Sequence, residues 1–361
     1  MKTNKIFQLL TLAICAVMFA FVTGCEGPAG PAGADGANGA NGADGADGIN
    51  GTNGSDGTDG VDGNAVCLEC HNVTTKSDVS LAYEESTHGM SNVQYDGRFT
   101  YQYASDGDGR KSCAPCHSNE GFVETQYTGY DSVRVALVAA QRIQCTTCHS
   151  FHESLDFENE PNSALRTNTP VELVMYDDGT KIDFEDNSNL CANCHQPRTA
   201  APTSDGDDFM VTSKYYGPHH GPQATVLSHI GGYELGTGFP VGDNAHAASS
   251  CVGCHMDESD HSFDPALAAC NTTDCHDGGI SSVTDNSRQN TIKTLMTVLQ
   301  GELKTAGLLD DTDHAVPGTY GIDSAGSLYN YLLIMDDRSN GIHSFPYVEK
   351  LLNNSINYFQ D

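Results

Sequence analysis

The sequence contains no tryptophan, and only 38% of its 361 residues are hydrophobic. Side chains alone would give a thin interior, so we expect something else to fill it. Cations are also scarce, because 17 Lys and Arg stand against 48 Asp and Glu, a formal net charge of −31. Such a field repels nucleic acid and excludes that class of partner, whereas it favours basic partners, cations or mineral surfaces bridged by cations.

Long apolar runs are missing beyond the first residues of the chain. Residues 6–22 are apolar, follow two lysines, and are too short and wrongly flanked for a membrane span, which predicts an export signal over residues 1–24. Val22-Thr23-Gly24-Cys25 resembles the lipobox of bacterial lipoproteins, which implies lipidation at Cys25 and an outer-membrane anchor. The alternative is an ordinary signal with an unrelated cysteine.

Glycine recurs at every third position from Gly27 to Gly63 without a break. Only glycine fits the axis of three wound polyproline-II chains, so residues 25–63 resemble a collagen-like stalk that could join three chains. Only Pro28 and Pro31 occupy the repeat, and the alternative is a flexible acidic spacer. In an extended form of about 3.1 Å per residue, the segment could hold the rest of the chain about 120 Å from the lipid.

Residues 64–361 form the expected functional domain, with a fold that is mostly irregular with some α-helix. A hairpin is predicted over Val171–Phe184 because Asp177-Asp178-Gly179 is a turn signal. Apolar periodicity predicts helices at Asp131–Ile143, Ser287–Leu308, Ser324–Met335 and Phe345–Phe359. The remaining loop content suits a fold organised by cofactors.

No cysteine of this domain stands alone. Apart from Cys15 in the signal and Cys25, the twelve remaining cysteines form six pairs, and a histidine follows the second member of each pair directly. Five pairs have the spacing C-x-x-C-H, and the sixth has four intervening residues. In chain order we number them motif 1 (Cys67, Cys70, His71), motif 2 (Cys113, Cys116, His117), motif 3 (Cys145, Cys148, His149), motif 4 (Cys191, Cys194, His195), motif 5 (Cys251, Cys254, His255) and motif 6 (Cys270, Cys275, His276).

This spacing matches the chemistry of covalent haem attachment. Two thiols add to the two haem vinyl groups, and the next histidine reaches the iron as its proximal ligand. Zinc sites and disulfides also use C-x-x-C pairs, but neither requires a histidine after every pair. The sequence therefore predicts six haem c groups, and it leaves no thiol for a structural disulfide.

Nine histidines lie outside the motifs, and six irons have up to six distal positions to fill. His152 is the clearest candidate, because it follows His149 by three residues and should reach a neighbouring haem. His246 and His261 flank motif 5 and are expected to join neighbouring haems similarly, and His88 lies between motifs 1 and 2. His229 and His314 are left over.

The motif series resembles the multihaem cytochromes c of metal-respiring bacteria and their relatives among ammonia-forming nitrite reductases and octahaem enzymes. Two segments are similar to segments of that family: 217–224, Gly-Pro-His-His-Gly-Pro-Gln-Ala, and Gly341-Ile342-His343 before a final helix. The resemblance implies a haem-organised multihaem cytochrome fold, with His343 and one of His219 or His220 as distal ligands. We select His220.

The expected function is electron transfer through six closely spaced haems with two histidine ligands each, at the outer cell surface, in extracellular or anaerobic respiration. Expected partners are redox proteins and extracellular acceptors. One alternative is a reductase of a small nitrogen or sulfur oxyanion with one open iron face, although C-x-x-C-K, which marks catalytic haems in relatives, is absent. Another alternative is a subunit of a cytochrome filament, in which ligands can cross between chains.

Overall fold

The computed structural model describes most of the chain after residue 66, and these residues belong to one compact unit, Val61–Asp361. The expected boundaries at residues 24/25 and 63/64 lie outside this part and stay predictions. The described residues are 67–68, 71–90, 94–95, 98–99, 101–105, 110–152, 164–203, 206, 208–219, 221–242, 244–273, 275–276 and 279–361.

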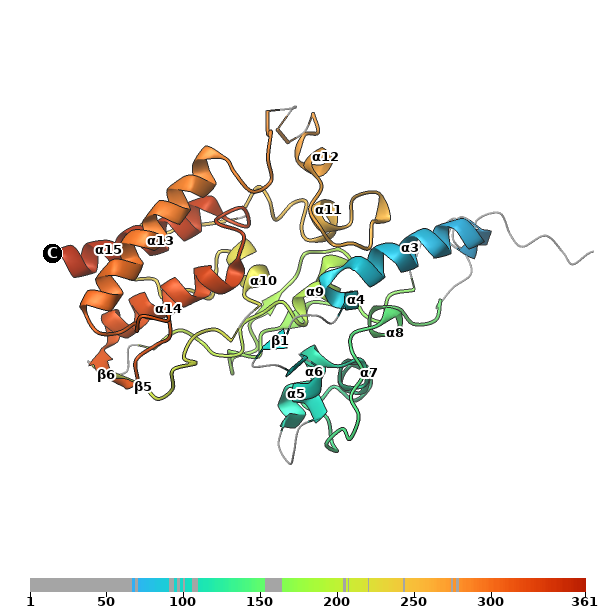
Figure 1. Ribbon diagram of the computed structural model, residues 1–361, viewed down its shortest axis with the longest axis horizontal. Coiled ribbons are helices and arrows are strands. Elements are labelled where there is room, and N and C mark those ends of the chain that lie inside the picture. The colour runs from blue at the N-terminus through green and yellow to red at the C-terminus, as the bar shows by residue number, and fades with distance from the viewer. Residues whose placement is uncertain are drawn as a thin grey trace, which may run out of the picture. The chain divides into compact units, whose positions relative to one another are not determined.

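Short helices separated by irregular chain make up the half that carries the motifs, as Figure 1 shows from blue to yellow. This confirms a mostly irregular fold with some helix and little sheet. The helices are α3 (Val73–Glu85), α4 (Thr87–Met90), α5 (Gln102–Ser105), α6 (Ala114–His117), α7 (Asn119–Thr128), α8 (Cys145–Cys148), α9 (Ser188–Ala192), α10 (Gln223–Leu227), α11 (Val252–His255) and α12 (Leu267–Cys270), with 3-10 turns η1 (Arg110–Ser112) and η2 (Asp257–Ser259).

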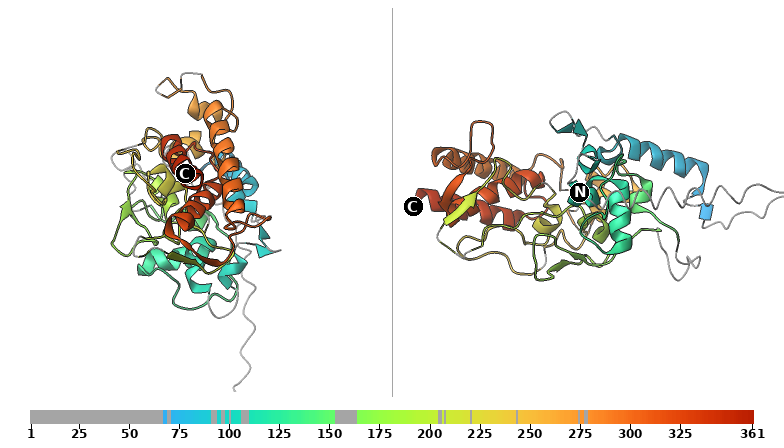
Figure 2. Two further views of the ribbon diagram at one scale, coloured as in Figure 1. Left: turned by 90° about the vertical axis from the view of Figure 1, so that its left-hand side faces the viewer. Right: turned by 90° about the horizontal axis from the view of Figure 1, so that it is seen from below.

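Three long helices end the chain: α13 (Ser287–Thr305), α14 (Ile322–Asp337) and α15 (Phe345–Gln360). They pack side by side, in orange and red in both views of Figure 2. Asn286 and Ser344 cap α13 and α15, since each side-chain oxygen accepts the backbone N–H three residues later. The three helices confirm the predictions at 287–308, 324–335 and 345–359, with small differences at their ends.

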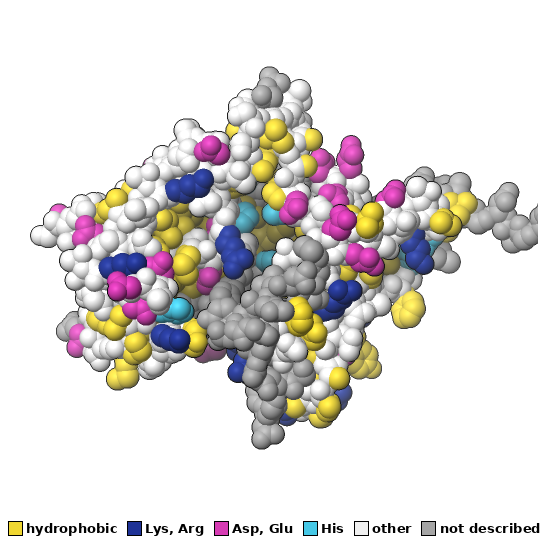
Figure 3. Space-filling view, in the orientation of Figure 1, with side chains coloured by type: hydrophobic (Ala, Val, Ile, Leu, Met, Phe, Trp, Pro, Cys, Tyr) yellow, Lys and Arg dark blue, Asp and Glu magenta, His cyan; other side chains and the backbone are white. Residues whose placement is uncertain are grey.

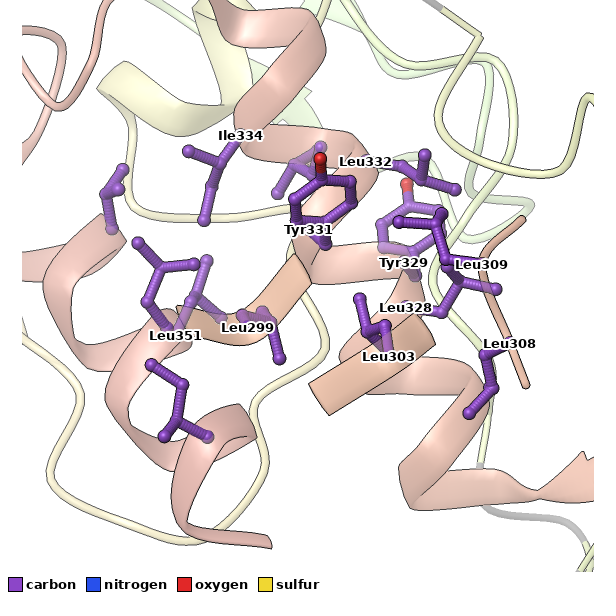
Figure 4. Packing of buried hydrophobic residues seen from close by; sticks show 14 of the residues in the cluster. Leu299, Leu303, Leu308, Leu309, Leu328, Tyr329, Tyr331, Leu332, Ile334 and Leu351 are labelled. Carbon is purple, nitrogen blue, oxygen red and sulfur yellow. The ribbon is translucent and has the colours of Figure 1, made fainter. Parts of the chain in front are cut away.

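The main hydrophobic core lies between these helices, as Figure 4 shows. Residues Ala325–Ile334 of α14 are all buried, so this helix is covered on every side. α15 instead buries one stripe, which includes Val348, Leu351, Leu352 and Ile356. A smaller cluster around Leu173, Ile182 and Ala192 lies under motif 4.

Three two-stranded antiparallel ladders complete the described secondary structure. β3 (Val171–Glu172) pairs with β4 (Lys181–Ile182), which confirms the predicted hairpin. β5 (Asp208–Val211) pairs with β6 (Gly318–Gly321), a long-range contact that joins the motif-bearing half to the C-terminal helices. The third ladder joins β1 (Gln94–Tyr95) to β2 (Arg98–Phe99).

The predicted helix at Asp131–Ile143 is wrong. α7 ends at Gly129, which has φ +69, and the chain then runs without helix to α8. Backbone N–H groups here bond to distant acceptors, such as Arg134 N to Glu124 Oε1 at 3.1 Å and Gln141 N to Glu120 Oε2 at 2.9 Å. The apolar pattern suggested one buried face, but tertiary contacts satisfy the backbone instead.

None of the helices in the described ranges combines the length and the apolar character that crossing a bilayer requires.

Candidate functional site

Motifs 2 to 5 each fold into a single turn that gathers the two cysteines and the histidine. In motifs 2 to 5 the histidine N–H donates to the carbonyl of the first cysteine, at 3.1, 2.8, 3.0 and 2.9 Å. A helical turn places residues three and four apart on one face, so the two thiols and the imidazole are held by neighbouring backbone. The four residues of C-x-x-C thus form one turn of helix, and the histidine is the residue that follows this turn.

Motif 6 reaches the same closure in spite of its longer spacing. His276 N donates to Cys270 O at 3.2 Å, as the histidines of motifs 2 to 5 do to their first cysteines. α12 ends at Cys270, and the two extra residues lie in the loop that follows it. The motif is therefore compatible with the same attachment chemistry as the other five.

The clearest feature of the structure is a set of six imidazole pairs. Each pair joins one motif histidine to one histidine from outside the motifs, and no motif histidine is used twice. Figure 3 shows histidine side chains in a hollow of the face in view, beside hydrophobic ones. The ring-centroid distances are 6.1 Å for His71–His152, 6.4 Å for His117–His219, 6.1 Å for His149–His261, 6.0 Å for His195–His88, 6.4 Å for His255–His343 and 6.2 Å for His276–His246.

These separations match two imidazoles that bind one iron from opposite faces. An imidazole nitrogen binds a first-row metal at about 2.0 Å and the ring centre lies about 1.1 Å behind it, so such centroids are about 6.2 Å apart. The angle between ring planes, in contrast, varies from 30° to 89°. A shared metal fixes the separation and leaves the rotation free, so the residues present fit haem with two axial histidines.

The partner rings can be compared with the expected distal ligands. His88, His152, His246, His261 and His343 each lie beside a motif histidine, and His152 pairs with motif 1 rather than with its own neighbour His149. Ligation itself stays a prediction.

The sixth position differs from the expectation. His219 lies beside His117, whereas the selected His220 is outside the described residues. Cys25 and Cys70 are outside them too. The leftover His229 stacks on Tyr347, and His314 Nδ1 contacts Thr312 Oγ1 at 2.8 Å, so these two rings have other neighbours.

Motif 4 lies against motifs 2 and 5. Cys194 Sγ is 3.9 Å from Pro115 O, and Cys116 Sγ is 3.8 Å from Asn193 O. The backbone N–H groups of Cys251 and Val252 both donate to Ser188 Oγ at 3.0 Å, three residues before Cys191. These contacts place the cysteines of the three motifs next to each other.

Two further observations show which of the other motifs are neighbours. The ring of Phe263 lies beside both His88 and His261, the partner rings of motifs 4 and 3, so these two motifs are neighbours, and burial followed by the charge of Cys191 raises the pKa of Cys148 to about 11. α11, which holds Cys254, packs against α12, which holds Cys270, so motif 6 lies beside motif 5, and burial followed by the charges of both motif 6 thiols raises the pKa of Cys254. Motif 1 adjoins motif 3 through His152. The contacts therefore give the order 1, 3, 4, 5, 6, with motif 2 on motif 4.

The second nitrogen of several of these imidazoles has a defined acceptor. His255 Nδ1 is 2.7 Å from Phe263 O, His261 Nδ1 is 2.8 Å from Ser259 O, and His246 Nδ1 is 2.5 Å from Ile342 O. With Nδ1 as the donor in each contact, the ring presents Nε2 to the iron. These acceptors fix both the tautomer and the ring orientation.

Phe263 was not anticipated from the sequence. Its carbonyl meets His255, and its ring lies 4.9 Å from His88 and 6.0 Å from His261. It therefore touches ligand candidates of motifs 3, 4 and 5. Its φ of +60 is unusual for a non-glycine residue, and nothing in the local sequence signals it.

Burial keeps one imidazole pair in the form that binds iron. Desolvation, with a smaller contribution from His195, lowers the pKa of His88 to about 4. Desolvation likewise lowers the pKa of His195, although Gln223 opposes the shift. Both rings are thus neutral at physiological pH, as a metal ligand must be.

Comparison with known proteins found one family model and two solved structures similar to parts of this chain. Residues 22–66 match the family described as "Collagen triple helix repeat (20 copies)". Two solved structures are similar to the chain. One is the outer cell wall cytochrome OcwA, with TM-score 0.49 and 17% identity over 77% of this chain and 50% of that one.

A second similar structure is the undecaheme cytochrome from the S-layer of Carboxydothermus ferrireducens. Its TM-score is 0.42, with 17% identity over 76% of this chain and 40% of that one. The present chain thus spans half or less of the length of these two proteins. No curated protein matches the sequence.

Proposed function

We propose that this chain binds six haem c groups, each between two histidines, and transfers electrons between them. The observation that carries the proposal is the set of six motif-to-partner imidazole pairs at 6.0–6.4 Å. When bound, each haem supplies an iron that takes up and releases one electron, at a potential set by its ligands and surroundings.

The chain's own residues hold each attachment site and both axial positions. The thiols fix the porphyrin edge, the motif histidine takes one face, and the partner histidine takes the other. A face closed by an imidazole cannot bind a small substrate, so the pairing favours electron transfer over reduction of an oxyanion. Every motif histidine also has its partner within the same chain, which favours a self-contained domain over a filament with exchanged ligands.

The contacts between motifs suggest the route. With motif 4 against motifs 2, 3 and 5, we expect this site to be a junction between a main line, 1 to 3 to 4 to 5 to 6, and a branch at motif 2. A branched chain of haems has three ends, at motifs 1, 2 and 6. Electrons can therefore enter or leave at more than one haem.

The experiment that tests this function measures haem number and spin state. Mass spectrometry of the intact mature chain should give six haems, and the ferric protein should show only low-spin signals. His152→Ala should keep all six attachments but convert one iron to a high-spin or water-ligated form, because only the distal position of motif 1 is lost. His314→Ala is the matched control and should stay low-spin. A high-spin iron in the unaltered protein would favour the reductase.

Location at the outer surface of the cell follows from the N-terminal features. The signal over 1–24, the lipobox cysteine and the repeat of 25–63 together suggest a domain held away from the membrane by a lipid anchor. Cys25→Ser should abolish lipidation and release the haem-loaded protein from membranes, as fractionation and haem staining would report. Retention of that variant in the membrane would contradict the lipoprotein assignment without affecting the haem sites.

A further inference from the structure

The end of α14 and the turn after it reach imidazoles assigned to three motifs, two of them directly and one through Gln223. The carbonyls of Asp336 and Asp337 accept from Gln223 Nε2 at 3.1 and 3.3 Å, and Gln223 Oε1 lies 3.1 Å from His195 Nδ1. Ile342 O meets His246 Nδ1. The side chain of Asp337 meets His343 Nδ1 at 2.5 Å. Residues 336–343 therefore support ligand candidates of motifs 4, 5 and 6.

Asp337 differs from the other acceptors because it is a carboxylic side chain in the interior. The residue is 2% exposed, and its side chain is not exposed at all. Its Oδ2 also receives the backbone N–H of Ser339 at 3.3 Å and the Ser339 hydroxyl. Three hydrogen-bond donors therefore converge on the two oxygens. This environment suits a carboxylate, which accepts hydrogen bonds through both oxygens.

The described acceptors of the other imidazoles are neutral. His246, His255 and His261 contact backbone carbonyls, and His195 contacts the amide oxygen of Gln223. An anionic acceptor withdraws the Nδ1 proton more strongly and raises the basicity of the ring. A more basic imidazole favours the ferric iron, which carries one more positive charge than the ferrous iron.

We propose that Asp337 is a positioning and tuning residue that fixes His343 over motif 5 and lowers the reduction potential of that haem relative to a site with a neutral acceptor. The inference rests on the proposed function, since it requires an iron between His255 and His343. Because motif 5 lies between motifs 4 and 6, its potential sets how readily electrons pass along that end of the molecule.

The test is Asp337→Asn in the full haem-loaded chain. Asparagine can still accept from His343 Nδ1 through its amide oxygen, so the ring keeps its place while the charge is lost. In a spectroelectrochemical titration, the midpoint potential of one component should rise by about 59 mV. This rise corresponds to a change of about tenfold in the one-electron reduction equilibrium of that haem. All six irons should stay low-spin, with a changed ferric EPR signal for one of them.

Two further variants keep the inference falsifiable. Ser339→Ala removes a donor that competes for the carboxylate, so the same component should move downward, opposite to Asp337→Asn. Asp178→Asn removes an equal charge from an exposed turn and should leave the potentials unchanged. Unchanged potentials in Asp337→Asn, or shifts of the same sign in Asp337→Asn and Ser339→Ala, would overturn the tuning role.

His343→Ala separates this inference from the proposed function. It should create a high-spin signal at one iron, and that signal should belong to the component that responds to Asp337. If His343→Ala leaves every iron low-spin, the ligand assignment at motif 5 fails, and with it the basis of the proposed function at this site. If only the Asp337→Asn shift is missing, the tuning role fails alone.

Discussion

His219 and His220 are adjacent in the chain, yet a single iron beside His117 can accept only one of them on its distal face. The ring of His219 lies 6.4 Å from that of His117. The backbone of His219 has φ +69, a left-handed conformation that directs its side chain differently from those of its neighbours. We therefore expect His219→Ala to create one high-spin iron, at motif 2, with all six haems still attached.

His220→Ala is the matched variant for this prediction and should keep a low-spin spectrum. Both substitutions remove one imidazole from the same segment, so the comparison isolates ligation from general loss of packing. The reverse outcome, with a high-spin iron in His220→Ala alone, would restore the ligand selected from the sequence.

The attachment motifs can be recognised at the scale of single residues because the chemistry that they imply is local. Two thiols and a histidine within five or seven positions indicate a haem site without any knowledge of the fold. Distal ligands carry a weaker signal, since each arrives from a distant part of the chain, and the sequence does not distinguish the adjacent His219 and His220. Asp337 and Phe263 have no local signature, because their roles arise only from tertiary contacts.

Among the elements, the C-terminal helices were predictable because their apolar spacing continues over many residues, and two of them begin after a capping residue. Asn286 and Ser344 start α13 and α15 at the expected residues. Residues 131–143 show a similar apolar pattern, but Val135 and Val138 are 73% and 96% exposed. The pattern alone could not reveal that carboxylates of α7 take up the amide groups of this segment.

Two helical glycines give a matched test of the packing around α14. A Cβ at Gly326 would lie 2.1 Å from a ring carbon of Tyr233, and that ring is tied to Asp323 by its hydroxyl at 2.6 Å. Gly326→Ala should therefore destabilise the protein by about 1–3 kcal/mol through overpacking. Gly301 in α13 has open space around it, so Gly301→Ala should stabilise by about 0.5–1 kcal/mol.

Urea unfolding followed by far-UV circular dichroism would report both changes. The haem spectra should be unaffected in both variants, because neither glycine contacts a motif or a partner imidazole. Equal stability of the two variants would mean that the ring of Tyr233 can move aside, and that α14 is packed less rigidly than its burial indicates.

For the whole molecule, buried hydrophobic residues are concentrated in α13, α14 and α15, while the motif-bearing half has only small clusters. This distribution agrees with the low hydrophobic content of the sequence, which predicted an interior filled by something other than side chains. The helical part also provides the second contacts of three motifs, through residues 336–343. Protein packing and the candidate haem sites are therefore linked at one turn, and we expect the remaining motif sites to depend more directly on bound haem.

We expect the repeat of residues 27–63 to determine whether the mature protein is a monomer or a trimer. Its unbroken glycine period and its match to the collagen repeat favour a triple helix, although two prolines and many aspartates should make that helix weak. We expect the mature chain to sediment as a trimer in the cold and to dissociate to monomers in a cooperative transition on mild heating, with no change in the haem spectrum. A variant without residues 27–63 should be monomeric at every temperature. If the full mature chain is also monomeric in the cold, the segment is a flexible spacer. If the shortened chain remains trimeric, association belongs to the haem domain.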